Sequence, residues 1–142
     1  MREIKFRIFD KHKKHMHKLD SLFLDEKMFR VIDYKEEHDV FSYDTEYFSV
    51  PMQYTGLKDK KGVEIYEDDI VKTLQCVWDN DGKSAIMQVV FINGHQHNGF
   101  VGKIINNEKL GGVYIPPYSR IDSSYEVIGN IYENPELLKG AK

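Results

Sequence analysis

The stretch from Met52 to Lys72, MQYTGLKDKKGVEIYEDDIVK, constrains the fold more than any other part of the chain. Polar and apolar residues alternate on both sides of a short polar segment, as in two strands joined by a tight turn. Within that segment, Asp59 can accept hydrogen bonds from the backbone that follows it, and Gly62 can adopt a positive φ. The acidic run Glu67–Asp69 then separates this hairpin from a longer apolar strand. Short strands linked by such turns predict a small β-barrel.

The same alternation predicts strands along the rest of the chain. They are expected at residues 4–9, 15–17, 70–78, 84–92, 100–105, 113–115 and 125–132. Residues 21–51 fit neither the helical nor the strand period well, and strands separated by charged turns are expected there at 29–34 and 40–43. A short helix near Asp25 to Arg30 is the alternative in the least regular region. Gly129 is typical of a bulge or a close backbone approach, and Asn134 followed by Pro135 indicates the start of one helical turn. Met16 and Phe23 are expected to face inward.

Length and composition agree with this fold class. A chain of 142 residues predicts one compact domain. The 13% aromatic content favours β structure over a helical bundle. We therefore expect a mainly β protein: an N-terminal strand and variable extension over residues 1–49, a barrel over 50–134, and a short helical turn and tail over 135–142.

Three blocks of the sequence carry a resemblance to a known family. They are MREIKFRIFD at the start, the central Met52–Lys72 stretch and YEVIGNIYENPELL near the end, and together they cover roughly a third of the chain. In this order and spacing they resemble the YopX family, small proteins of bacteriophages and prophages. The resemblance implies an SH3-like β-barrel and brings no established activity or catalytic residue. The family usually has Gly at the position of Asp68, and Asp adopts a positive φ less readily than Gly.

Composition also narrows the classes of function. The single cysteine, Cys76, excludes an internal disulfide and a CxxC metal site, which fits the reducing cytoplasm of a bacterial host. No apolar run approaches the roughly 20 residues of a membrane span, so no membrane partner is expected. The net charge of −3 gives no overall attraction to nucleic acid.

Candidates for chemistry are few. His15 and His17 would share one face of a strand, and His95 and His97 repeat the spacing in a polar loop, so four imidazoles could in principle bind zinc. No carboxylate at fixed spacing completes either pair, and we predict no metal and no cofactor. The acidic group of Glu64 and Glu67–Asp69 is interpreted as a solvated turn with local capping bonds.

Two surfaces are candidates for binding. SH3-like barrels often bind ligands through aromatic side chains beside variable loops, and the aromatic candidates are Tyr66, Trp78, Tyr114 and Tyr118. The N-terminal segment is basic, with seven Lys or Arg against two acidic residues before position 19. Its candidate nucleic-acid contacts are Lys5, Arg7, Lys11, Lys13 and Lys14, for which only weak, non-specific binding is predicted.

Three functions are therefore open. The first is a non-enzymatic phage accessory protein that binds an unknown host or phage protein. The second is a nucleic-acid-binding β-barrel module, which a basic patch beside exposed aromatic side chains would support. The third is a small hydrolase or metal enzyme, which would require a pocket with convergent polar groups. Edge strands and many aromatic side chains also favour a homo-oligomer, most simply a dimer.

Overall fold

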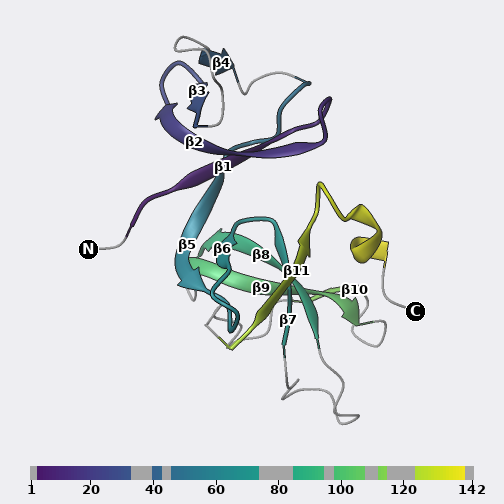
Figure 1. Cartoon of the computed structure of the whole chain (residues 1–142). Coiled ribbons are helices and arrows are strands. Elements are labelled where there is room, and N and C mark those ends of the chain that lie inside the picture. The colour runs from purple at the N-terminus through teal and green to yellow at the C-terminus, as the bar shows by residue number, and fades with distance from the viewer. Residues whose placement is uncertain are drawn as a thin grey trace. The chain divides into compact units, whose positions relative to one another are not determined.

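The computed structural model (Figure 1) describes residues 3–32, 40–42, 46–73, 85–94, 98–107, 112–114 and 124–139. The chain divides into two compact units, Met1–Tyr54 and Thr55–Lys142. Strands β1 to β11 make up nearly all of the regular structure in these ranges, together with one short 3-10 helix. The predicted mainly β class is confirmed. The predicted single domain with its three segments stays a prediction.

Unit 1 is built from antiparallel strands that follow one another along the chain. They are β1 (Phe6–Asp10), β2 (His15–Phe23), β3 (Met28–Val31), β4 (Val40–Ser42) and the first residues of β5 (Met52–Lys58). Their order in the sheet is β4-β3-β2-β1-β5, and β5 continues into unit 2, where β6 pairs with it. The unit has its own core, because Ile8, Phe29 and Val31 are buried. The rings of Phe41 and Phe48 pack on Phe29, with centroids 5.6 Å and 4.9 Å away.

Two turns of unit 1 have the same length and the same closing conformation. The turn Lys11–Lys14 lies between the paired residues Asp10 and His15, and the turn Leu24–Lys27 lies between Phe23 and Met28. In both turns the fourth residue is a lysine with φ of 53°. We call the first turn the basic tip (Lys11–Lys14). The second turn together with the residue before it is called the apolar tip (Phe23–Lys27). They lie at opposite ends of β2 (Figure 1). The second turn and β3 replace the alternative helix near residues 25–30, because cross-strand pairing to β2 satisfies this backbone.

Unit 2 contains a second antiparallel sheet. Its strands are β7 (Asp69–Lys72), β8 (Ile86–Asn93), β9 (Asn98–Asn107), β10 (Gly112–Tyr114) and β11 (Glu126–Asn130), in the order β10-β9-β8-β7-β11. Strand β6 (Glu64–Tyr66) comes before β7, and the 3-10 helix η2 (Pro135–Lys139) follows β11. Its core consists of buried residues of β6, β7, β8 and β9, together with the residue just before β8: Ile65, Val71, Ala85, Met87, Val89 and Ile104.

Two glycines, Gly62 and Gly129, have the backbone features that the sequence predicted for them, a positive φ and a bulge. Gly62 has φ of 84°, as its turn requires. At Gly129 the register of β11 against β7 shifts, so the predicted bulge is confirmed. A Cβ on Gly129 would also overlap the side chain of Asn134 and approach Leu137 Cδ1 to 3.0 Å, and this close packing leaves room only for glycine.

The predicted SH3-like barrel over residues 50–134 is not confirmed. In the described strands, pairing gives two open sheets, one ending at β4 and β6 and the other at β10 and β11. The turn at Glu67 and Asp68 separates β6 from β7, and these two strands belong to different sheets. Alternation along the sequence specifies which side chains share a face of the sheet, but it does not specify how the strands pair with one another. Because closure of a barrel depends on that pairing, the alternation was not sufficient to predict it.

Candidate functional site

The acidic group between β6 and β7 is bound internally. Asp69 is 1% exposed, and its Oδ2 accepts a hydrogen bond from the Tyr66 backbone N–H at 2.8 Å. The Tyr66 hydroxyl donates to Glu64 Oε2 at 2.9 Å, and the Tyr66 ring is buried. These contacts close the turn between the two strands. Tyr66, a predicted ligand contact, therefore lies inside unit 2 and not on its surface.

Asp68 is the centre of this turn. Its φ is 63°, its backbone N–H donates to the Val89 carbonyl, and its carbonyl accepts from the Ile131 N–H. Its carboxylate also has partners: Oδ1 accepts from Gln88 Nε2 at 2.8 Å, and Oδ2 accepts from the Tyr132 hydroxyl at 3.4 Å. Asp68 thus ties the turn to β8 and to the segment after β11, with both its backbone and its side chain.

Asp59 holds the other end of the hairpin. Its side chain is nearly buried, and it accepts three backbone hydrogen bonds: Oδ1 from Lys61 and Val63, and Oδ2 from Val127 on β11. Burial alone would raise the pKa of Asp59. The three backbone N–H groups and the charge of Lys61 outweigh it, so the pKa lies below its usual value. This carboxylate fastens the β5–β6 turn to the second sheet.

Two lysines of the same turn bind one carboxylate of β11. Glu126 forms ion pairs with Lys60 and Lys61, each with an N–O distance of 2.5 Å. These contacts lower the pKa of Glu126 to about 2, and the bond to Glu126 raises the pKa of Lys61. Asp59 and Glu126 therefore act together at one contact between the turn and β11.

The described carboxylates and imidazoles do not assemble a metal site. Among the described residues, no group of three or more His, Cys, Asp or Glu side chains could hold an ion. His15 and His17 do share one face of β2, with ring centroids 4.6 Å apart, as predicted. His95 and His97 lie outside the described residues, as do Trp78 and Tyr118, and only the backbone of Tyr114 is described, in β10.

The predicted basic residues divide into two groups. Lys5, just before β1, and Arg7, within it, are half-buried. Lys5 forms an ion pair with Glu3 at 3.0 Å, and its Nζ lies 5.3 Å from the centre of the Tyr54 ring. Lys11, Lys13 and Lys14 are all exposed in the basic tip. Of the five predicted basic contacts, the three lysines of this turn are therefore the exposed ones.

The basic tip has a defined backbone. Asp10 is nearly buried, and its Oδ1 accepts the backbone N–H groups of His12 at 2.9 Å and Lys13 at 2.7 Å. The Lys11 N–H donates to the Tyr47 carbonyl at 2.8 Å, which places Tyr47 directly beside the tip. The Tyr47 ring is 55% exposed. Sequence reasoning missed Tyr47, because it lies in a segment without clear periodicity.

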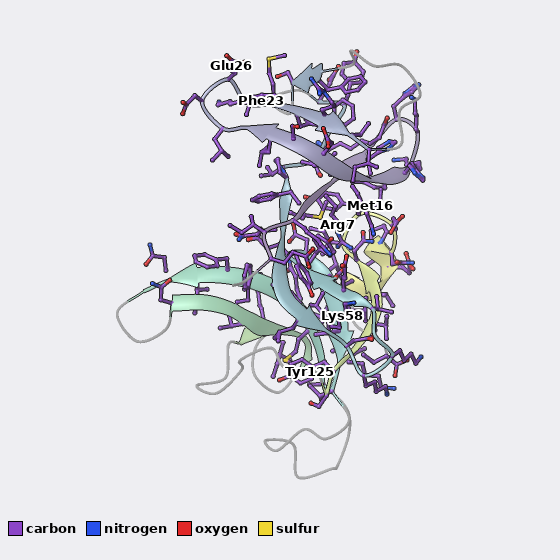
Figure 2. All side chains as sticks on the ribbon, turned by 60° about the vertical axis from the view of Figure 1, so that its left-hand side comes forward. Arg7, Met16, Phe23, Glu26, Lys58 and Tyr125 are labelled. Carbon is purple, nitrogen blue, oxygen red and sulfur yellow. The ribbon has the colours of Figure 1, made fainter. Side chains whose placement is uncertain are left out.

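The apolar tip exposes two large hydrophobic side chains. Phe23 is 39% exposed and Leu24 is 69% exposed. Figure 2 shows Phe23 and Glu26 at one end of β2 and Met16 towards the other. Asp25 and Glu26 in the same turn are exposed and acidic. The expectation that Phe23 faces inward is therefore wrong, because the strand ends there and its last side chain extends past the core of unit 1.

Comparison with known proteins gives the family. The sequence matches the family described as YopX protein over residues 5–139. The chain belongs to the YopX family. The crystal structure of protein EF1440 from Enterococcus faecalis is similar, with a TM-score of 0.58 and 26% identity, and the alignment covers 97% of this chain and 99% of that one.

A second solved structure has the same fold. The crystal structure of protein yopX from Bacillus subtilis aligns with a TM-score of 0.57 and 23% identity, covering 97% of this chain and 99% of that one. No curated protein matches the chain. In the part of the chain that is described, no helix is long and apolar enough to cross a membrane.

Proposed function

We propose that this YopX-family protein is a non-enzymatic accessory protein of a bacteriophage or prophage, which acts in the host cytoplasm by binding another protein through its apolar tip. The observation that carries the proposal is the exposure of Phe23 and Leu24 at the end of a hairpin with a defined backbone. Leu24 is about two-thirds exposed and follows the exposed Phe23, so a partner that buries both side chains gains binding free energy.

The charges of the tip indicate the chemistry of the partner. Asp25 and Glu26 border the two apolar side chains, and both are exposed. A partner surface with an apolar pocket and a basic rim would complement this tip, and complementary charges raise association rates and reject wrong partners. The carboxylates of Asp59, Asp68 and Asp69 support the non-enzymatic part of the proposal, since each is already bound by groups of unit 2.

The test is an affinity capture with matched variants. Immobilised wild-type protein is incubated with nuclease-treated host lysate, in parallel with Leu24→Asp and Val50→Asp. Val50 is a suitable control because it lies in the same unit and is 70% exposed, close to the 69% of Leu24. Circular dichroism first establishes that the three proteins fold alike.

We expect wild type and Val50→Asp to capture the same protein in stoichiometric amounts and Leu24→Asp to lose it. The captured protein, once purified, should bind wild type in a two-component titration. Capture of the protein from untreated lysate but not from nuclease-treated lysate would contradict the proposal, and so would capture that Leu24→Asp leaves unchanged.

A further inference from the structure

The basic tip presents three cations on a turn with a defined backbone. Lys11, Lys13 and Lys14 are exposed, and within the described part of the chain no ion pair joins Lys11 or Lys14 to a carboxylate. Asp10 pairs with His15 at the base of the tip and is nearly buried. Its carboxylate accepts hydrogen bonds from two backbone N–H groups of the turn. Its carboxylate therefore orders the backbone of the tip, whose lysine side chains are exposed.

An exposed aromatic residue, Tyr47, lies in the segment that is hydrogen-bonded to the basic tip. The hydrogen bond from the Lys11 N–H to the Tyr47 carbonyl joins the two segments, and the isolated pairing of Asp10 with Phe48 extends the contact. Phe48 is packed on the core of unit 1, which anchors the backbone that carries Tyr47. Tyr47 itself is more than half exposed. Glu46, the residue before Tyr47, is also exposed and adds a negative charge to this segment.

We propose that the basic tip and Tyr47 form a binding site for single-stranded nucleic acid, in which the lysines contact phosphates and an unpaired base stacks on the Tyr47 ring. Lysine clusters neutralise phosphates without reading the sequence, and base stacking on an aromatic side chain accepts any base. Here a backbone hydrogen bond joins the tip to the segment that carries Tyr47, so one single strand can contact both elements. A duplex offers phosphates but no unpaired base to the ring.

The site is separate from the apolar tip, and it goes beyond the proposed protein-binding function. The two tips lie at opposite ends of β2, a strand of 9 residues. At about 3.3 Å per residue, the strand separates them by about 30 Å. One protein molecule could therefore hold a protein partner and a nucleic acid at the same time.

The number of lysines sets the expected salt dependence. Each phosphate neutralised on a single strand changes the slope of log K against log salt by about −0.7, so three lysines give a slope of about −2. Affinity for the single strand should then fall about 20-fold between 50 and 200 mM salt. The dissociation constant at physiological salt is expected near ~10⁻⁴ M, in the non-specific range.

The test is a fluorescence anisotropy titration with a fluorescein-labelled oligothymidine of about 20 nucleotides, long enough for the site sizes of single-strand binding proteins. A triple variant replaces the three tip lysines with Gln. Its control makes the same charge change at three exposed lysines outside both tips, Lys58, Lys72 and Lys139. Tyr47→Ala removes the ring, and Tyr47→Phe keeps it.

We expect the tip variant to lose the salt slope while the control triple keeps it. Tyr47→Ala should lower affinity at least about fivefold, the lower end of the stacking contribution, and Tyr47→Phe should bind like wild type. Equal losses in the two triple variants, or binding unaffected by Tyr47→Ala, would overturn the proposal. So would a polyglutamate peptide that competes as well as oligothymidine, since the tip would then recognise acidic proteins.

Discussion

Replacing Asp59 tests whether one carboxylate fastens the hairpin turn to the second sheet. Asp59→Ala removes three hydrogen bonds, from the N–H groups of Lys61, Val63 and Val127. Bonds to a charged acceptor contribute about 1.5–3 kcal/mol each, so three at the lower end give about 4–5 kcal/mol. That is a large part of the 5–15 kcal/mol by which domains are usually stable. The melting temperature should fall by roughly 10–20 °C.

Asp59→Asn gives a sharper result, because the change is nearly isosteric. The amide oxygen can still accept from Lys61 and Val63, but an NH₂ group then faces the N–H of Val127. We expect a loss of about 1–3 kcal/mol, measured by urea unfolding and compared with Asp25→Asn on the exposed apolar tip. An Asp59→Asn protein as stable as wild type would refute the argument.

Acidification should reproduce part of this loss. Because the pKa of Asp59 is lowered in the folded protein, its stabilising contribution is complete above the unfolded value of about 3.9. The contribution disappears as pH falls through the folded pKa, when the carboxylate gains a proton. The stability difference between wild type and Asp59→Asn should therefore be constant from pH 7 to about 5 and shrink below about pH 4.

Changes at Asp68, at two glycines and at the lysine partners of Glu126 have defined outcomes. Asp68→Gly relieves a φ of 63° but loses the bonds to Gln88 and Tyr132, so the free energy of unfolding, measured by thermal unfolding, should change by less than about 1 kcal/mol. Asp68→Ala loses the same bonds and keeps the strain, so it should cost about 1–2 kcal/mol more. In Gly62→Ala the added Cβ meets no atom within 4 Å, so the change should cost only the backbone strain of about 1–2 kcal/mol. In Gly129→Ala the added Cβ overlaps Asn134, so urea unfolding should show this variant to be clearly less stable than wild type. A carboxyl-detected NMR titration should give Glu126 a midpoint of about 2, rising toward 4.5 when both lysine partners are changed to Gln.

Local chemistry in the sequence predicted the turns and the faces of the strands. Gly62 and Gly129 occupy the special conformations that their positions indicated, and Asn134–Pro135 begins a 3-10 helix. Such features depend on a few neighbouring residues, so propensity and spacing are sufficient to find them. Strand pairing is different: β5 pairs with β1 at one end and with β6 at the other, and no local pattern specifies this choice.

The candidate sites were harder to predict, because exposure depends on tertiary packing. Tyr66 was expected at a surface but is buried with its hydroxyl bound to Glu64. Phe23 was expected inside but is exposed where β2 ends. Tyr47 had no sequence signal, since only its pairing with Lys11 places it beside the basic tip. Of the basic candidates, the tip lysines are exposed, and Lys5 is paired with Glu3.

The two matching turns on β2 have a consequence for how such proteins diverge. Each is a four-residue loop closed by a strand pair, with its last residue at φ of 53°, so the two loops share a length and a closing conformation while they carry different side chains. The strand residues that pair to close each loop, Asp10 with His15 and Phe23 with Met28, lie outside the four loop residues. Exposed loop residues tolerate substitution far better than core residues. A chimaera with KHKK and LDEK exchanged should keep its sheet and reverse its polarity. Ligand preference in this framework can thus evolve one loop at a time, without any change to the core.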